Sequence, residues 1–153
     1  MPPFKQILVP TDFSDDSVRA MEYSIDVARQ NQAKLSVIHV MDNYYQHNME
    51  YGGGPGLELA KQLRVEMLET LETELGAFIQ RFALEGLSCQ YKLLEGNPST
   101  EIIEYVAENS FDLVVIGSHG KRKGLWQLGS VAEKVVHHSR SCVLVIKPEV
   151  ISS

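Results

Sequence analysis

Residues 113–131 read LVVIGSHGKRKGLWQLGSV and carry the clearest structural pattern in this chain. Four apolar residues run directly into Gly117, which predicts a buried parallel strand that ends where the backbone bends sharply. Gly120 follows in the same loop, and Gly129-Ser130 opens a segment with helical periodicity. A strand, a glycine-rich loop and a helix N-terminus in this order are typical of an anion site, because glycines let the backbone approach the ligand and free N–H groups point at it.

Outward from this stretch, apolar runs that fit strands alternate with segments that fit helices. This alternation predicts an α/β fold, a parallel sheet with helices on both faces, in one domain over residues 1–153. Ligands bind such sheets beyond the carboxyl ends of the strands, where the strand order reverses, so the segments after the first and fourth strands would meet there in the order 3-2-1-4-5. The expected strands cover 6–10, 34–40, 87–94, 113–116 and 143–147, and the expected helices start after Ser14, cover 57–85, follow Asn97-Pro98 and cover 130–138.

The composition is that of an ordinary globular chain with an acidic balance. The net charge of −6 disfavours binding to nucleic acid, which needs a basic face. Cys89 and Cys142 lie in apolar, strand-like contexts without metal-ligand spacing, so we expect buried free thiols in a reducing compartment. We see neither a signal-peptide pattern nor an apolar run long enough to span a membrane, and we therefore expect a cytoplasmic protein without membrane contact.

Asp12 follows the first expected strand directly, in the run Pro10-Thr11-Asp12, and precedes the helix that Ser14 is expected to cap. A carboxylate at the carboxyl end of a strand can accept hydrogen bonds from ribose hydroxyls or from an adenine amino group. The alternative is that Asp12 closes an Asx turn or caps the helix. Taken alone, the residue favours this structural role.

The loop before the last helix is the stronger signal for a ligand. Backbone N–H groups of residues 117–120 and 129–131 could cradle a phosphate. The hydroxyl of Ser130 would add a donor, and Lys121 or Arg122 would add positive charge. These features predict phosphate binding at the carboxyl edge of the fourth strand.

The same residues also have a purely structural interpretation. Ser130 and Glu133 form a capping box that would satisfy the helix end, and the glycines would then only turn the chain. His119 lies inside the loop and could contact a phosphate or serve as an ordinary turn residue. A capped helix end remains a good anion site, so the two interpretations overlap.

Other chemistries lack their motifs. The loop has no Gly-Lys-Ser/Thr as a Walker A loop requires, and the glycine run at 52–56 does not join a strand to a helix as a dinucleotide fingerprint does. No histidine has metal-ligand spacing, and no serine–histidine–acid arrangement is convincing. The segment 41–56 is long enough to suggest a lid or a partner contact.

Five stretches, in their order and spacing, resemble the universal stress protein family over nearly the whole chain: ILVPTDFS at 7–14, VIHV at 37–40, GSHG at 117–120, GSVAEKV at 129–135 and VLVI at 143–146. The resemblance implies an adenine nucleotide alpha hydrolase-like fold, with an open sheet of five parallel strands in the order 3-2-1-4-5. It also implies a homodimer, commonly joined through the last strand, here Cys142 to Lys147. The sequence makes this dimer plausible because an apolar strand at a sheet edge invites pairing, although helices on both faces would explain the same composition.

Members of the family that bind ATP carry a glycine, two residues, a glycine, nine residues, a glycine and then serine or threonine. Gly117 and Gly120 match, but the eight residues from Lys121 to Leu128 precede Gly129, so this loop is one residue shorter. With these matching glycines, the resemblance implies that the ligand is ATP, or ADP or AMP. It also implies that Mg²⁺ or Mn²⁺ is held through the phosphates.

The resemblance also implies a role for each site residue. Asp12 would contact the ribose or the base, the Val40 backbone would meet the adenine edge, and the two glycine segments would hold the phosphates. The full set expected to bind the cofactor is Pro10, Thr11, Asp12, Val40, Ile116, Gly117, Ser118, His119, Gly120, Lys121, Gly129, Ser130 and Val131.

Three functions remain open at this point. The first is a dimeric regulatory protein of the stress response whose nucleotide state changes its shape or partners. The second is a slow ATPase or autophosphorylating protein, suggested by the cationic loop, although no general base or water-positioning residue can be named. The third is a nucleotide-free dimeric interaction module, suggested by the shortened loop.

Overall fold

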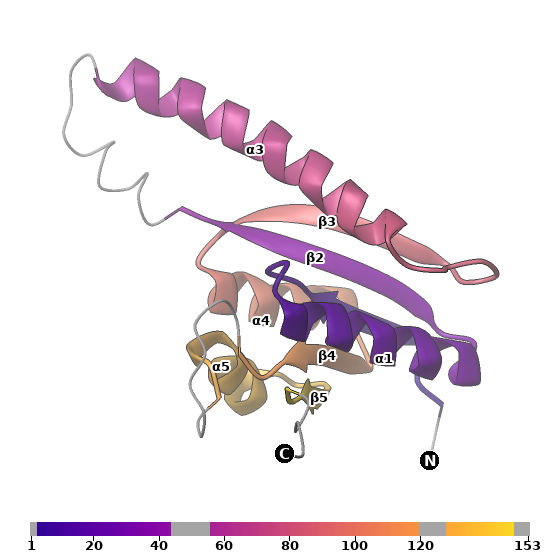
Figure 1. The fold of residues 1–153 in the computed structure, drawn as a ribbon. Coiled ribbons are helices and arrows are strands. Elements are labelled where there is room, and N and C mark those ends of the chain that lie inside the picture. Colours follow the sequence, from indigo (N-terminus) through magenta and orange to yellow (C-terminus); the bar gives the residue numbers. More distant parts are fainter. Residues whose placement is uncertain (1–2, 44–55, 120–127, 149–153) are drawn as a thin grey trace, which may run out of the picture.

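The computed structural model describes residues 3–43, 56–119 and 128–148. In these ranges every expected strand and helix is present, with shifts at some ends (Figure 1). In chain order the elements are β1 (Gln6–Pro10), α1 (Asp15–Asn31), β2 (Lys34–Asp42), α3 (Gly56–Gln80), β3 (Cys89–Gly96), α4 (Pro98–Asn109), β4 (Leu113–Gly117), α5 (Ser130–His138) and β5 (Cys142–Ile146).

The five strands form one parallel sheet in the order β3-β2-β1-β4-β5, which confirms the predicted order. The chain builds outward from β1 to β2 and β3, and then crosses to the other side of β1 for β4 and β5. The strand order therefore reverses between β1 and β4. In an open parallel sheet a ligand crevice opens beyond the carboxyl ends at this point.

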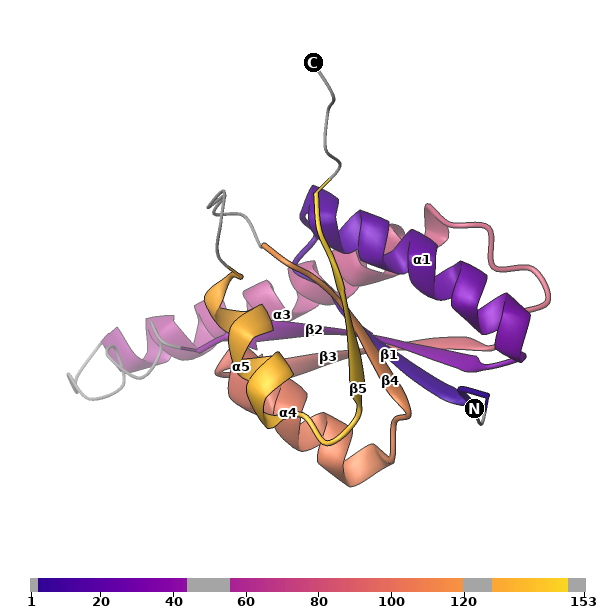
Figure 2. The same cartoon turned by 90° about the horizontal axis from the view of Figure 1, so that it is seen from below.

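The helices lie in two layers, α1 and α3 on one face of the sheet and α4 and α5 on the other (Figure 2). Along β1, Ile7 and Val9 pack with α1 and α3, whereas Leu8 packs with α4 and α5, and all three are fully buried. This alternation follows from the two-residue period of a strand. A central strand covered on both faces must be apolar at every position, which explains its continuous apolar run.

The largest departure from the predicted elements is in α3, which ends at Gln80 rather than at residue 85. The N–H groups of Arg81 and Phe82 donate to carbonyls three residues earlier, both at 3.2 Å, and so close the helix with a tighter turn. Its large buried side chains, Leu75, Phe78 and Ile79, all lie in its second half. The first half projects beyond the sheet (Figure 1), so the apolar residues there are more exposed.

Arg64 ties α3 to β3 through Glu95. Its Nε donates to Glu95 Oε1 at 2.7 Å and its Nη2 to Oε2 at 2.5 Å, a bidentate pair. The hydrogen bonds from Arg64 lower the pKa of Glu95, against a smaller opposing effect of burial.

Both cysteines are free thiols, but the prediction that both are buried is wrong for Cys142. That residue is exposed because it opens β5, the edge strand. Cys89 is partly buried, and burial raises the pKa of its thiol. No helix in the three described ranges is long and apolar enough to cross a membrane.

Candidate functional site

A cavity of about 530 Å³ opens where the strand order reverses, a volume typical of small-molecule sites. Residues from the carboxyl ends of β1, β2 and β4 line it, together with the N-terminal ends of α1, α4 and α5. They are Pro10, Thr11, Asp12, Ser14, Ser17, Ile38, His39, Val40, Asp42, Pro98, Ile102, Ile116, Gly117, Ser118, His119, Gly129, Ser130, Val131 and Ala132.

Every predicted site residue that the structure describes lines this one cavity. Gly120 and Lys121 lie outside the described residues, as do most of the shortened loop and most of the segment 41–56. The sequence did not identify His39 or Asp42 as site residues, although both line the cavity. Their position near the carboxyl end of a buried strand was the only available signal.

The corner between β1 and α1 is held by its own side chains. Asp12 Oδ1 accepts the Ser14 N–H at 3.0 Å, which is the Asx turn given above as an alternative. Thr11 Oγ1 accepts the Phe13 N–H at 3.0 Å and donates to Ser17 Oγ at 3.0 Å. Asp12 lines the cavity, and no hydrogen bond from the described residues reaches its Oδ2, so this oxygen can still accept one.

His39 supports the same corner from β2. Its Nδ1 lies 2.7 Å from the Thr11 carbonyl oxygen, which only accepts, so Nδ1 carries the proton of this hydrogen bond. The Phe13 ring stacks on the imidazole with centroids 4.4 Å apart. Phe13 has a φ of 65°, an uncommon conformation for a bulky residue, and the stack and the Thr11 hydrogen bond hold it there.

The N-terminus of α5 is capped differently from the N-termini of α1 and α4. Ser14 caps α1 and Asn97 caps α4, each by accepting a backbone N–H of the first turn. The N-cap of α5 is Gly129, which has no side-chain cap. The helix covers 130–138 as predicted, but the capping box with Ser130 as the cap is wrong, because Ser130 is the first helical residue and Gly129 holds the cap position.

This uncapped end faces the cavity. The first N–H groups of a helix have no partner within the helix, and the macrodipole places partial positive charge there. Gly129 itself donates its N–H to the Ser118 carbonyl at 2.7 Å, which joins the start of α5 to the end of β4. The arrangement offers backbone donors to an acceptor inside the cavity, and an anion is the acceptor that suits it best.

Gly117 is needed for a close approach rather than for a turn. Neither it nor any cavity glycine in the described ranges has a positive φ. A Cβ on Gly117 would lie 2.9 Å from Asp16 Cβ and 3.0 Å from the Asp16 carbonyl carbon. The interpretation that Gly117 only turns the chain is therefore wrong. A glycine is needed there because β4 packs closely against α1.

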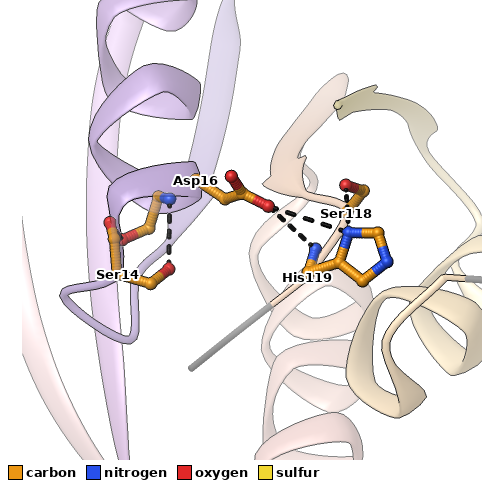
Figure 3. Close-up of polar contacts among 5 residues, drawn as sticks. Ser14, Asp16, Ser118 and His119 are labelled. Atoms are coloured by element: carbon orange, nitrogen blue, oxygen red, sulfur yellow. Dashed lines mark hydrogen bonds and ion pairs between the residues drawn. The ribbon is translucent and has the colours of Figure 1, made fainter. Parts of the chain in front are cut away.

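Asp16 reaches across this contact to the end of β4 (Figure 3). Its Oδ2 accepts the His119 N–H at 3.3 Å and lies 3.8 Å from His119 Nδ1, which in turn lies 2.8 Å from Ser118 Oγ. The sequence analysis did not identify Asp16 as a site residue. No local pattern could have found this role, since the partners are 103 positions apart in the chain.

A second hollow, of about 460 Å³, lies between β3 and α4 and has the opposite character. Three carboxylates line it, from Glu101, Glu104 and Glu108, with Lys92 among them. Carboxylates repel anions, so this hollow does not compete for a phosphate. In the described ranges no cluster of three or more histidine, cysteine or acidic residues is placed to hold a metal ion.

The fold and the cavity define an open parallel α/β protein with a ligand-sized site at the reversal of strand order. A model of the universal stress protein family matches residues 3–147, and the chain belongs to that family. Universal stress protein MJ0531 of Methanocaldococcus jannaschii is 35% identical over 147 residues, which are 94% of this chain and 82% of that protein. The resemblance drawn from the five sequence motifs is confirmed.

Solved structures agree with the fold. Hypothetical protein MJ0577, from the same organism, has a TM-score of 0.82 at 26% identity and covers 97% of this chain and 99% of its own. The universal stress protein from Archaeoglobus fulgidus in complex with dAMP has a TM-score of 0.58 at 21% identity, over 96% of this chain and all of that one. At 21% identity, the similarity to the Archaeoglobus fulgidus protein shows a shared fold and nothing more.

Proposed function

We propose that this chain is a single-domain protein that binds an adenine nucleotide, ATP or else ADP or AMP, in the cavity between β1 and β4. The observation that carries the proposal is the uncapped N-terminus of α5, which faces a ligand-sized cavity while α1 and α4 are capped by their own side chains. A phosphate there would accept the hydrogen bonds that a capping side chain otherwise accepts.

The rest of the cavity suits a nucleoside. Ile38, Val40 and Ile102 give it an apolar side for a flat base, and the Val40 backbone would meet the adenine edge. Asp12 has an oxygen available for ribose hydroxyls or the base amino group. The fold neighbour that holds dAMP supports an adenine nucleotide on this kind of sheet.

The phosphates would lie along the described donors of Gly117–His119 and Gly129–Val131, with Gly120 and Lys121 as further proposed contacts. Mg²⁺ or Mn²⁺ would enter with the phosphates, as their counter-ion, rather than on a protein site.

We further propose that the protein acts in the cytoplasm as a homodimeric regulator of the stress response. The support is the edge of the sheet at β5, where Leu144 is 37% exposed and no strand of the described residues pairs with the outer side of β5. Unpaired edge groups invite a second copy of the strand. Light scattering should give the mass of two chains, and a Leu144→Lys variant should shift the mass toward one chain.

Calorimetric titration with ATP and Mg²⁺, and separately with ADP, AMP and GTP, tests the proposed ligand. We expect saturable binding of the adenine nucleotides and much weaker binding of GTP. No heat at millimolar nucleotide, with the protein folded by circular dichroism, would contradict the proposal. Phosphate release measured on the same sample separates binding from turnover.

A further inference from the structure

The imidazole of His119 is nearly enclosed, yet one of its nitrogens has no hydrogen-bond partner among the described residues. The side chain is 12% exposed, and Nε2 is a buried atom without a hydrogen bond in the described part of the chain. The residue lines the cavity, and Nε2 points away from Asp16 (Figure 3). Because an unpaired buried polar atom costs free energy, a group from outside the chain that bonded Nε2 would be favoured there.

The other ring nitrogen, Nδ1, lies within electrostatic reach of the Asp16 carboxylate, although the distance is too long for a hydrogen bond. A carboxylate can only accept, and Oδ2 lies 3.8 Å from Nδ1 while it also accepts the backbone N–H of the same residue. Asp16 therefore favours the forms of the ring that carry a proton on Nδ1, with Ser118 Oγ beside it at 2.8 Å. When the ring is neutral and its proton is on Nδ1, Nε2 carries no proton and can only accept a hydrogen bond. When the ring is the imidazolium cation, Nε2 carries a proton and donates.

We infer that Asp16 is a positioning residue for His119, and that His119 couples the binding of a phosphorylated ligand to the uptake of one proton at Nε2. The inference rests on the proposed nucleotide site. Phosphate oxygens are acceptors, so they meet a lone pair on the neutral ring and a charged N–H donor on the imidazolium. The proton comes from solvent, and no covalent bond of the ligand changes.

The sign of the effect follows from linkage. The bound ligand favours the imidazolium, so binding takes up a proton wherever the free ring is neutral. The affinity that His119 contributes is then greatest at low pH, and it falls as pH rises through the range in which imidazoles titrate. The steepest dependence that a single proton allows is about tenfold in affinity per pH unit.

Few other charged groups of the described residues face this ring or its cavity. Asp16 comes from α1, Asp12 follows β1, and His39 and Asp42 come from β2. The end of β5 meets Ser118 through the Ile146 carbonyl, which accepts the Ser118 N–H, and α5 contributes the positive end of its dipole. His39 is the other imidazole on the cavity, so it supplies the matched control.

The test is calorimetric titration of ADP with Mg²⁺ from about pH 6 to pH 8, in pairs of buffers with different ionisation enthalpies. Wild type should show net proton uptake that is absent from His119→Gln, because glutamine has an N–H donor but does not titrate. His39→Gln should keep the number of protons taken up per ADP bound, and this number is compared independently of any change in its affinity. Subtracting the His119→Gln profile from the wild-type profile removes the ionisation of ADP itself.

Asp16→Asn separates charge from hydrogen bonding, because its amide oxygen still accepts the backbone N–H of His119. We expect ADP affinity in this variant to fall several-fold at neutral pH, and proton uptake to move to lower pH. Long-range proton–nitrogen spectra of the free protein should show Nδ1 protonated in wild-type His119, and more of the Nε2 tautomer in Asp16→Asn.

The outcomes distinguish this inference from the proposed function. Binding of ADP without proton uptake, or uptake that survives in His119→Gln, would overturn the inference and leave the nucleotide site standing. An Nε2-protonated ring in the free wild-type protein would overturn the positioning role of Asp16. No binding of ADP by folded wild type would remove both proposals.

Discussion

The N-termini of α1 and α5 stand at the same edge of the sheet, each after a buried strand, but their backbone donors are satisfied in opposite ways. At α1, Ser14 caps the first turn and an Asx turn from Asp12 closes the approach. At α5 the cap position is Gly129 and has no side chain to offer. One strand–turn–helix corner is thus completed by the chain, and the other is left open toward the cavity.

The comparison shows how a fold with several equivalent helix ends selects one for a ligand. A side-chain cap contributes about 1 kcal/mol to stability, so leaving α5 uncapped gives up some stability in the free protein. The same N–H groups then remain available to a ligand, and the loss is recovered when an anion binds. Mutations at the two corners should therefore separate stability from binding.

The largest expected effect is at Gly117, where β4 meets α1. Gly117→Val should lower the free energy of unfolding by about 2–4 kcal/mol, since its Cβ would sit 2.9 Å from Asp16 Cβ and 3.0 Å from backbone. Urea denaturation followed by circular dichroism measures the loss. Gly56→Ala is the control, because no atom of the described residues lies within 4 Å of a Cβ there, and it should change stability by less than about 0.5 kcal/mol. Equal effects would show that the α1–β4 contact is not tight.

Gly129→Asp comes next, because it would close the open corner with a charged cap. We expect nucleotide affinity to fall by at least about tenfold, roughly 1.4 kcal/mol, while the free energy of unfolding stays the same or rises by a few tenths of a kcal/mol. Titration calorimetry and thermal melts measure the two quantities on one sample.

Gly129→Asn is the matched control for that variant. Asparagine caps as well as aspartate but brings no charge, so the difference in nucleotide affinity between the two variants isolates repulsion of the phosphate. Full affinity in both variants would show that the α5 terminus does not hold the ligand.

Two serine-to-alanine variants, one at each helix N-terminus, test the same contrast with smaller expected changes in the free energy of unfolding. Ser14→Ala should lower the free energy of unfolding by about 1 kcal/mol, because its hydroxyl oxygen accepts the Ser17 N–H at 3.3 Å. Ser130→Ala should cost less than about 0.5 kcal/mol, because Ser130 is exposed and does not cap α5. Urea denaturation curves of the two variants measure these losses. A loss of about 1 kcal/mol in Ser130→Ala would show that Ser130 does cap α5, contrary to the structure.

Sequence patterns predicted the strands, the helices and their order well, since the apolar runs and family motifs spread over the whole chain. Asp12 was predicted as a lining residue because it directly follows a strand, and Gly129 because it directly precedes a helix. Asp16 was missed as a site residue, since its contact with His119 depends on the packing of α1 on β4. The cap at Ser130 was misplaced because the hydrogen-bond pattern, rather than residue type, sets where a helix begins.

The smallest effect is expected at Glu95, whose pair with Arg64 lies beside the same edge but does not line the cavity. Its pKa is lowered in the folded protein, so the pair contributes stability above the carboxyl's unfolded pKa, and that contribution disappears as pH falls through the folded pKa. Glu95→Gln should cost no more than about 1 kcal/mol at pH 7, since the two side chains are 42% and 23% exposed and solvent screens the pair. The difference in stability between wild type and Glu95→Gln should shrink toward zero below about pH 4, while ADP affinity at pH 7 stays unchanged. A loss of ADP affinity in this variant would extend the ligand site to the α3–β3 contact, and the contrast between the two helix ends would then not suffice to locate it.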